Sequence, residues 1–190
     1  MKVVAFNGSP RKNGNTAQAI RVVLEELESQ GIATEFIQLG GTNVHGCRAC
    51  MRCAKNKDGR CSWDDDDMNI FIDKMREADG IIIGSPVYFS NVTAEVKALI
   101  ERAGFVALRN GNFLRRKVGA AVVVMRRAGG TFTYAAINYF FGITEMIVPA
   151  SNYWNLGVGL SPGEVQKDEE GIETFRTLGR NMAWLLKTIK

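Results

Sequence analysis

Four cysteines lie within fifteen residues of this 190-residue chain, and they are its only cysteines. Cys47, Cys50 and Cys53 follow one another at intervals of three, and Cys61 comes after seven intervening residues. Thiolates are the ligands of iron–sulfur clusters, and a [4Fe–4S] cluster takes four of them. Three closely spaced cysteines can line one side of such a cluster, and a fourth from further along the chain can close it. The spacing therefore predicts a site for one [4Fe–4S] cluster.

Other chemistries can use the same four thiols. The bacterial ferredoxin pattern C-x2-C-x2-C-x3-C-P has a shorter last gap, and it has proline where this chain has Ser62. Zinc also accepts four thiolates, although structural zinc sites favour paired C-x2-C knuckles that are separated by a longer span. A C-x-x-C pair such as Cys47 and Cys50 can form a redox-active disulfide, and the thiols can also remain free. Nearby positive charge would ease the reduction of a negatively charged cluster, and it comes from Arg48, Arg52, Lys55, Lys57 and Arg60.

A second candidate site is the polar, glycine-rich loop "NGSPRKNGNT" at residues 7–16. It follows an apolar stretch and precedes a helical pattern, and the N–H groups at such a helix N-terminus favour a phosphate. It is not a P-loop, because five residues separate Gly8 from Gly14 and Asn15 stands where that motif has lysine. The dinucleotide fingerprint G-x-G-x-x-G is absent as well. The loop indicates a phosphate site of another kind, and the alternative is an ordinary polar turn.

Two further loops have residues suited to a flat ligand. In "GSPVYFSN" (84–91), Tyr88 and Phe89 can stack on a ring system, or they can pack in the core. In "RRAGGT" (126–131), adjacent glycines let the backbone approach a ligand closely. Arg126 or Arg127 can contact an anionic or aromatic ligand there, and the alternative is a plain surface turn. Together the three loops suit a ligand with one phosphate and a flat ring, such as FMN.

The elements that must position these loops alternate between strands and helices. Apolar patterns predict strands at 2–6, 33–39, 79–89, 117–125 and 145–151, with helices between them and an amphipathic closing helix. "DDDD" (64–67) precedes a helical pattern, where carboxylates suit the helix N-terminus. The alternation predicts one domain over residues 1–190, an α/β fold with a doubly wound parallel sheet. Because such sheets bind ligands beyond the carboxyl ends of their strands, we expect the three loops and the cysteine insert to share that edge.

Composition excludes some function classes. Hydrophobic residues make up 46% of the chain, but no apolar run approaches the roughly 20 residues that span a bilayer. A net charge of +4 with short basic runs gives no case for nucleic-acid binding. The opening "MKVVAFNGSP" turns polar too early for a signal peptide. We therefore expect a cytoplasmic protein with no membrane and no nucleic-acid partner.

The motifs "NGSPRKNGNT" and "GSPVYFSNVTAEVKALIERAG" resemble the NADPH-dependent FMN reductase group of flavodoxin-like proteins, over most of the chain. The resemblance implies a five-stranded parallel sheet in the order 2-1-3-4-5, bound FMN, and a homodimer or homotetramer. It implies that the phosphate is held by Ser9, Arg11, Asn13, Asn15 and Thr16. It also implies that the flavin ring lies against Pro86, Val87, Tyr88, Phe89 and Ser90, with Arg127, Ala128 and Gly129 on its other side.

The cysteine spacing is similar to that of the iron–sulfur flavoprotein branch of this group, with Cys47, Cys50, Cys53 and Cys61 as the ligands. This resemblance implies a redox protein that passes electrons from a ferredoxin-like donor or NAD(P)H to a small-molecule acceptor. No side chain is expected to act as the catalytic acid or base. One alternative is a cluster-free NAD(P)H-dependent reductase of FMN or quinones. Another is a non-enzymatic module that binds zinc or phosphate.

Overall fold

The computed structural model describes residues 1–189 and contains alternating strands and helices. The strands are β1 (Lys2–Asn7), β2 (Ala33–Gln38), β3 (Gly80–Pro86), β4 (Val118–Met125) and β5 (Leu156–Val158). The helices are α1 (Asn15–Ser29), α2 (Arg52–Asn56), α3 (Met68–Glu77), α4 (Ala94–Arg109), α5 (Gly130–Ile143) and α6 (Glu169–Thr188), with a short 3-10 helix η1 (Glu164–Lys167).

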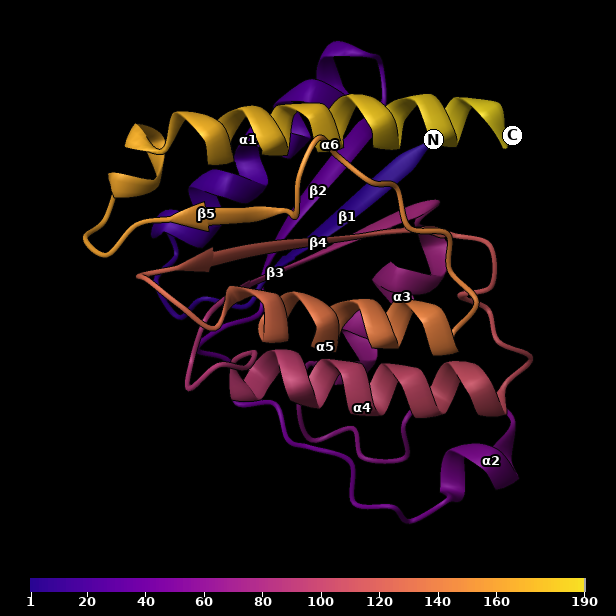
Figure 1. Ribbon diagram of the computed structural model, residues 1–190. Helices are drawn as coiled ribbons and strands as arrows, with labels where there is room; N and C mark the ends of the chain where they lie inside the picture. The colour runs from indigo at the N-terminus through magenta and orange to yellow at the C-terminus, as the bar shows by residue number, and fades with distance from the viewer. Residues whose placement is uncertain (190) are drawn as a thin grey trace.

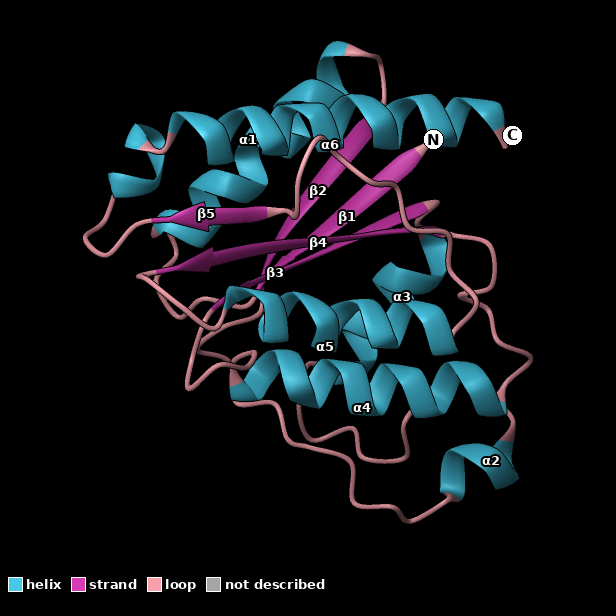
Figure 2. Cartoon of the chain, in the orientation of Figure 1, coloured by secondary structure: helices cyan, strands magenta, loops and turns pink. Residues whose placement is uncertain are grey.

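The five strands form one parallel sheet in the order β2-β1-β3-β4-β5. In the register of the sheet, Val4 of β1 pairs with Glu35 of β2 on one side and with Ile81 of β3 on the other. Figure 2 shows the sheet, with helices on both of its faces. This order is that of flavodoxin-like doubly wound sheets. The predicted fold class and strand order are therefore confirmed.

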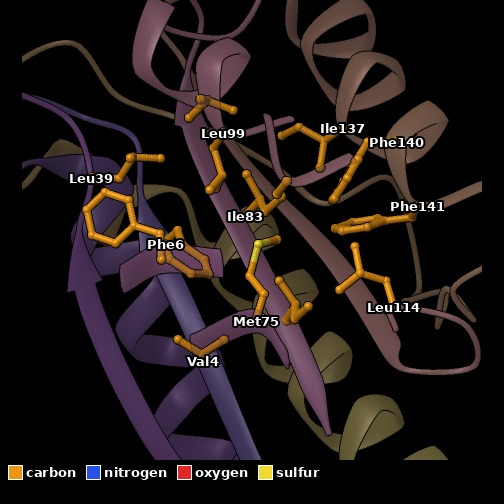
Figure 3. Packing of buried hydrophobic residues seen from close by; sticks show 14 of the residues in the cluster. Val4, Phe6, Leu39, Met75, Ile83, Leu99, Leu114, Ile137, Phe140 and Phe141 are labelled. Carbon is orange, nitrogen blue, oxygen red and sulfur yellow. The ribbon is translucent and has the colours of Figure 1, made fainter. Parts of the chain in front are cut away.

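Two hydrophobic layers hold helices against the sheet. Because successive strand residues point to opposite faces, Val4 and Phe6 join the layer under α3, α4 and α5, whereas Val3 and Ala5 join the layer under α1 and α6. Figure 1 shows the same division of the helices. Figure 3 shows the first layer, in which Phe6 lies near Met75 of α3 and Ile83 of β3. The consecutive isoleucines of β3 are fully buried, as the sequence pattern predicts for a central parallel strand.

The predicted fifth strand at 145–151 is wrong. Only Ile147 in that range makes a bridge, to Val118, and the true edge strand is the three-residue β5. Pro149 has no backbone N–H to offer a ladder, and Ile147 and Val148 are exposed rather than buried. Since β5 is so short, it has too few residues to show a recognisable pattern in the sequence.

The insert between β2 and α3 covers residues 39–67. It starts at the end toward which the strands point and runs along the outer side of α4 to α2, which lies beyond α4 and away from the sheet (Figure 1). α4 therefore contacts the sheet core through Val96, Leu99 and Ala103, and it contacts the insert on its other side. Within residues 1–189, no helix is both long and apolar enough to cross a membrane.

Candidate functional site

A cleft of about 210 Å³ lies at the carboxyl ends of the strands. It brings together the three loops that the sequence singles out and a fourth loop that follows β5. An open groove continues from it past Arg126 and Leu160 toward Lys167 and Asp168. The lining residues of the cleft are Ser9, Arg11, Asn15, Thr16, Pro86, Val87, Tyr88, Val124, Arg126, Gly159 and Leu160.

The first loop is fixed by close backbone contacts before any ligand arrives. The N–H of Gly8 donates to the carbonyl oxygen of Gly84 at 2.8 Å, and Thr93 Oγ1 donates to the carbonyl oxygen of Gly8 at 2.9 Å. A Cβ on Gly8 would lie 2.1 Å from Val96 Cγ2, so only glycine fits there. Further along, the N–H of Arg11 donates to Ser9 Oγ at 3.2 Å and tightens the turn. The loop is thus preorganised around the N-terminus of α1, where N–H groups lack helical partners.

The structure separates the predicted phosphate-binding residues into two groups. Ser9, Arg11 and Thr16 line the cleft, and Ser9 and Thr16 are otherwise buried. Asn15 also lines the cleft, but its side chain is occupied: Oδ1 accepts from the N–H of Gly163 at 2.8 Å and Nδ2 donates to the carbonyl oxygen of Ser161 at 2.9 Å. Asn13 does not line the cleft, and its Oδ1 accepts from the guanidinium of Arg21 at 3.4 Å.

The second loop forms a tight turn that presents its aromatic residues to solvent. Tyr88 and Asn91 exchange two backbone hydrogen bonds of 2.9 Å. Between them, Phe89 and Ser90 have φ angles of +47° and +59°, the left-handed geometry of a two-residue hairpin turn. Tyr88 is about half exposed and Phe89 is fully exposed. Core packing of these aromatics, the alternative raised by the sequence, is therefore wrong. Pro86, Val87 and Tyr88 line the cleft, whereas Phe89 and Ser90 lie at the tip of the turn.

The third loop packs against the second. Gly129 has a φ of +83°, and a Cβ on it would lie 2.8 Å from Ser90 Oγ and 3.0 Å from Val87 Cγ1. Glycine is thus required both for the turn and for the close approach of the two loops. Arg127 and Ala128 are exposed and do not line the cleft, which Arg126 lines instead.

The four cysteines line a different pocket. It shares no residue with the cleft, and its other walls come from the insert and from Arg102, Phe105 and Val106 of α4. Arg102 and Val106 lie eight and twelve residues after Ala94, which is about 12–18 Å along the helix axis at 1.5 Å per residue. The expectation that the cysteines lie at the same edge as the first loop is therefore wrong. The insert begins at that edge, but its cysteines lie over the second half of α4.

The donor set of this pocket fits an iron–sulfur cluster. All four cysteines are unpaired, and no histidine or carboxylate lines the pocket with them. Burial raises the pKa of the Cys53 thiol, and the nearby thiols of Cys61, Cys47 and Cys50 raise it further. The other three thiols therefore lie near Cys53, and four thiolates are the ligand set that a [4Fe–4S] cluster takes. Among residues 1–189, no group of three or more Cys, His, Asp or Glu side chains is arranged to hold a metal ion.

Hydrogen bonds from α4 and α3 hold the insert in place. The backbone N–H of Cys47 donates to Glu101 Oε2 at 3.1 Å, and Asn110 Nδ2 donates to the carbonyl oxygen of Cys53 at 3.3 Å. Asn69 of α3 makes two hydrogen bonds with the backbone of Cys61: its Oδ1 accepts from the Cys61 N–H at 2.8 Å, and its Nδ2 donates to the Cys61 carbonyl oxygen at 2.9 Å. Asp67 lies at the N-cap of α3 but makes no side-chain cap hydrogen bond, so the predicted capping by residues 64–67 is limited to Asp66, whose Oδ1 accepts from the N–H of Met68 at 3.1 Å.

Comparison with known proteins agrees with this geometry. The family model of NADPH-dependent FMN reductases matches residues 1–160. The chain belongs to this family. It is 43% identical to an iron–sulfur flavoprotein of Methanocaldococcus jannaschii over 100% of both chains. It is 36% identical to an iron–sulfur flavoprotein of Methanosarcina thermophila, over 100% of this chain and 97% of the other.

Solved structures confirm the fold of this FMN reductase family member. The crystal structure of RosB, with a bound 8-demethyl-8-formylriboflavin-5'-phosphate intermediate, superposes with a TM-score of 0.75 at 22% identity. The match covers 100% of this chain and 80% of RosB. Family membership makes the protein a flavin-dependent oxidoreductase, and it argues against a non-enzymatic zinc- or phosphate-binding module.

Four of the residues that line the cleft of this FMN reductase family member were not among those implied by the family resemblance: Val124, Arg126, Gly159 and Leu160. Gly159 and Leu160 follow β5, so the misplaced fifth strand hid them. Val124 sits at the end of β4, where it looks like an ordinary core residue. Whether Arg126 or Arg127 lines the cleft depends on the direction of the chain as it leaves β4. Two adjacent arginines in the sequence do not indicate that direction.

Proposed function

We propose that this chain holds FMN in the cleft and one [4Fe–4S] cluster on Cys47, Cys50, Cys53 and Cys61. It passes electrons from a reduced donor to a small-molecule acceptor. The observation that carries this proposal is the convergence of all four cysteines on one pocket, in a chain that also has a preorganised cleft at its strand ends. When bound, FMN supplies one- and two-electron chemistry and the cluster supplies one-electron chemistry. The protein's own residues bind and orient these groups.

In the cleft, the phosphate is held by Ser9, Arg11 and Thr16, together with the N–H groups at the start of α1. Asn15 acts through its backbone N–H, because its side chain ties down residues 161–163. Asn13 buttresses the loop through Arg21. The flavin ring lies between the Pro86–Tyr88 segment and the loop after β4. The rim of the ring site is formed by Phe89, Ser90, Arg127, Ala128 and Gly129.

The test is the cofactor content of protein purified without oxygen. The proposal expects about four irons and four acid-labile sulfides per chain, with one FMN. Iron-free protein from a host that assembles clusters would contradict the cluster, and zinc in place of iron would favour a structural metal site. Protein that takes up no FMN on reconstitution would contradict the flavin site.

For the donor, we propose an acidic electron carrier of the ferredoxin type that docks at the cysteine pocket. Exposed basic side chains surround that pocket, and apolar Met51 and Phe105 are exposed among them. These basic side chains are Arg48, Arg52, Lys55, Lys57 and Arg109. Electrostatic steering predicts that reduction by such a carrier slows as salt is added. A rate independent of ionic strength would contradict this docking mode.

A cluster-free NAD(P)H-dependent reductase of FMN or quinones is the second candidate. Its support is the family itself and the open groove that runs from the cleft past Leu160 to Lys167, where an elongated ligand can lie. NADPH oxidation by protein without iron would favour it. Reduction by a ferredoxin-type carrier but not by NADPH would favour the first candidate.

We also propose that the protein is a cytoplasmic homodimer or homotetramer. Phe132, Tyr139 and Ile143 lie seven and four residues apart along α5, and all three are at least two-thirds exposed. An apolar face of this kind typically marks an interface. Sedimentation velocity on the parent and on Tyr139→Glu tests this, with a smaller species expected for the variant. A monomeric parent would contradict it.

A further inference from the structure

We propose that Arg102 is a positioning residue that holds the Cys61 sulfur and stabilises the reduced state of the cluster. The inference rests on the proposed cluster. Arg102 is on α4, and its side chain is only 2% exposed. A buried arginine needs partners for each of its N–H groups. The partners of Arg102 all belong to the cysteine insert.

The guanidinium of Arg102 reaches residues on both sides of the cysteines. Its Nε donates to Cys61 Sγ at 3.3 Å. Its Nη1 donates to the carbonyl oxygen of His45 at 3.2 Å and to the carboxylate of Asp66, and its Nη2 donates to the carbonyl oxygen of Trp63 at 2.6 Å. Because the guanidinium is planar and rigid, these bonds fix the start and the end of the insert relative to one another.

Asp66 compensates the buried charge. Its side chain is 3% exposed, and it pairs with Arg102 while also accepting from the N–H of His45 at 3.1 Å. The ion pair keeps the guanidinium charged inside the protein, which leaves Nε–H as a charge-assisted donor to sulfur. Hydrogen bonds to ligand sulfurs tune the potential of iron–sulfur clusters. Since reduction adds negative charge, a buried positive donor favours the reduced state and raises the reduction potential.

The other basic side chains near the pocket do not occupy this position. Arg48 also lines the pocket, but it is exposed and its guanidinium stacks on the Trp63 ring at 3.3 Å from the centroid. Water and salt screen exposed charges of this kind. Arg102 is the buried cation among the pocket residues, and within the described residues it is the one side chain that hydrogen-bonds to a cysteine sulfur. The other donor to a cysteine sulfur there is a backbone group, the N–H of Ala49, which donates to Cys47 Sγ at 3.4 Å. Arg48→Gln therefore removes a neighbouring exposed positive charge and separates the effect of burial from that of charge alone.

The test is a redox titration of the cluster, monitored by electron paramagnetic resonance, in two variants. Arg102→Lys keeps the charge but loses the planar set of donors. The double variant Arg102→Gln with Asp66→Asn removes both buried charges, so no unpaired carboxylate remains. We expect the double variant to stabilise the reduced cluster about tenfold less, which lowers the potential by about 59 mV for a one-electron couple. Arg102→Lys should fall between it and the parent, and Arg48→Gln should lower the potential by much less than the double variant does, because the Arg48 charge is exposed and screened.

The flavin and iron contents of each variant are measured together with its potential, and the combination decides the role of Arg102. A lowered potential, or loss of iron with FMN retained, supports the role of Arg102 at Cys61. An unchanged potential in a fully loaded variant overturns it. Loss of both FMN and iron from both variants also overturns it, because Arg102 would then be needed only for folding. If the parent protein itself carries no iron, the proposed cluster fails instead, so the two failures are distinguishable.

Discussion

The cleft and the cysteine pocket are built by opposite means. The cleft is made by loops at strand ends, and backbone contacts hold it, such as the hydrogen bond from Gly8 to Gly84. The cysteine pocket is made by an insert whose regular structure is the five-residue α2, and side chains of α3 and α4 hold it. The topology of the doubly wound sheet thus brings the loops of the cleft together, whereas the position of the cysteine pocket depends on a few specific side chains. A substitution that disrupts one site should therefore leave the cofactor content of the other unchanged.

The largest expected effect is on the metal content of Cys53→Ser. Removal of one thiolate from a four-thiolate set should abolish the cluster, with near-complete loss of iron. FMN content should stay at the parent value, because Cys53 lines the cysteine pocket and not the cleft. Iron and flavin assays on anaerobically purified protein check both. Ser62→Ala is the control, because the buried Ser62 hydroxyl has no hydrogen-bond partner within the part of the chain that the structure describes, residues 1–189. Joint loss of FMN and iron would show that the sites are coupled.

Next in size is the loss of stability in Asp66→Asn. Breaking a buried ion pair from one side leaves the Arg102 charge uncompensated and typically costs about 3 kcal/mol or more. The loss should concentrate in the insert, so amides of residues 45–67 should exchange faster while those of β1 and β3 do not. Hydrogen exchange by mass spectrometry measures this. A uniform loss of protection from hydrogen exchange across the sheet would contradict the claim that side chains of α3 and α4 hold the insert in place.

The same variant predicts a pH dependence. Burial alone would raise the pKa of Asp66, but hydrogen bonds from Arg102, His45 and Met68 outweigh it and lower the pKa. A lowered folded-state pKa adds stability above the unfolded value of about 3.9, and this stability is lost as the pH falls through the folded value. The difference in unfolding free energy between parent and Asp66→Asn should therefore be full at pH 6 and shrink below about pH 4. A constant difference down to pH 3 would contradict it.

Gly8→Ala tests the backbone-built site. The new Cβ would meet Val96 Cγ2 at 2.1 Å and the Gly84 carbonyl oxygen at 2.7 Å. We expect a loss of about 1–3 kcal/mol from overpacking and weaker FMN binding, with the iron content of folded protein unchanged. Chemical denaturation and flavin titration measure the two. Gly142→Ala is the control, since nothing lies within 4 Å of a Cβ there. Parent-like flavin affinity in Gly8→Ala would contradict the role of this contact.

The smallest expected effect is that of Tyr88→Ala. Tyr88 lines the cleft but is half exposed, so its loss should change stability by less than about 0.5 kcal/mol. Loss of an aromatic contact worth about 0.5–1.5 kcal/mol should weaken FMN binding roughly 2–10-fold. Fluorescence titration with FMN measures it, beside Phe132→Ala, an exposed aromatic residue that does not line the cleft. Equal affinities for the two variants would remove Tyr88 from the flavin site.

The same contrast explains which features were predictable from the sequence. The first four strands, the first loop and the second loop follow local rules: buried runs such as Ile81–Ile83, and glycines and polar residues between a strand and a helix. The strand order was predicted from the family resemblance and not from these rules. The four cysteines were recognisable as candidate ligands from their spacing, but the location of their pocket was not. That location depends on Arg102, whose hydrogen bonds to the insert join residues far apart in the sequence. From the sequence alone, Arg102 cannot be distinguished from the other charged residues of a helix. The tie from Asn15 to residues 161–163 is equally long-range, and it is invisible locally.

The central claim is that one chain holds two redox groups at two independent sites. An anaerobic reductive titration, followed by visible absorption, tests it most directly by counting electrons. FMN takes two electrons and a [4Fe–4S] cluster takes one, so the account predicts about three electrons per chain. In Cys53→Ser the count should fall to about two with the flavin bleaching intact. A parent protein that accepts two electrons, all of them at the flavin, would contradict the claim.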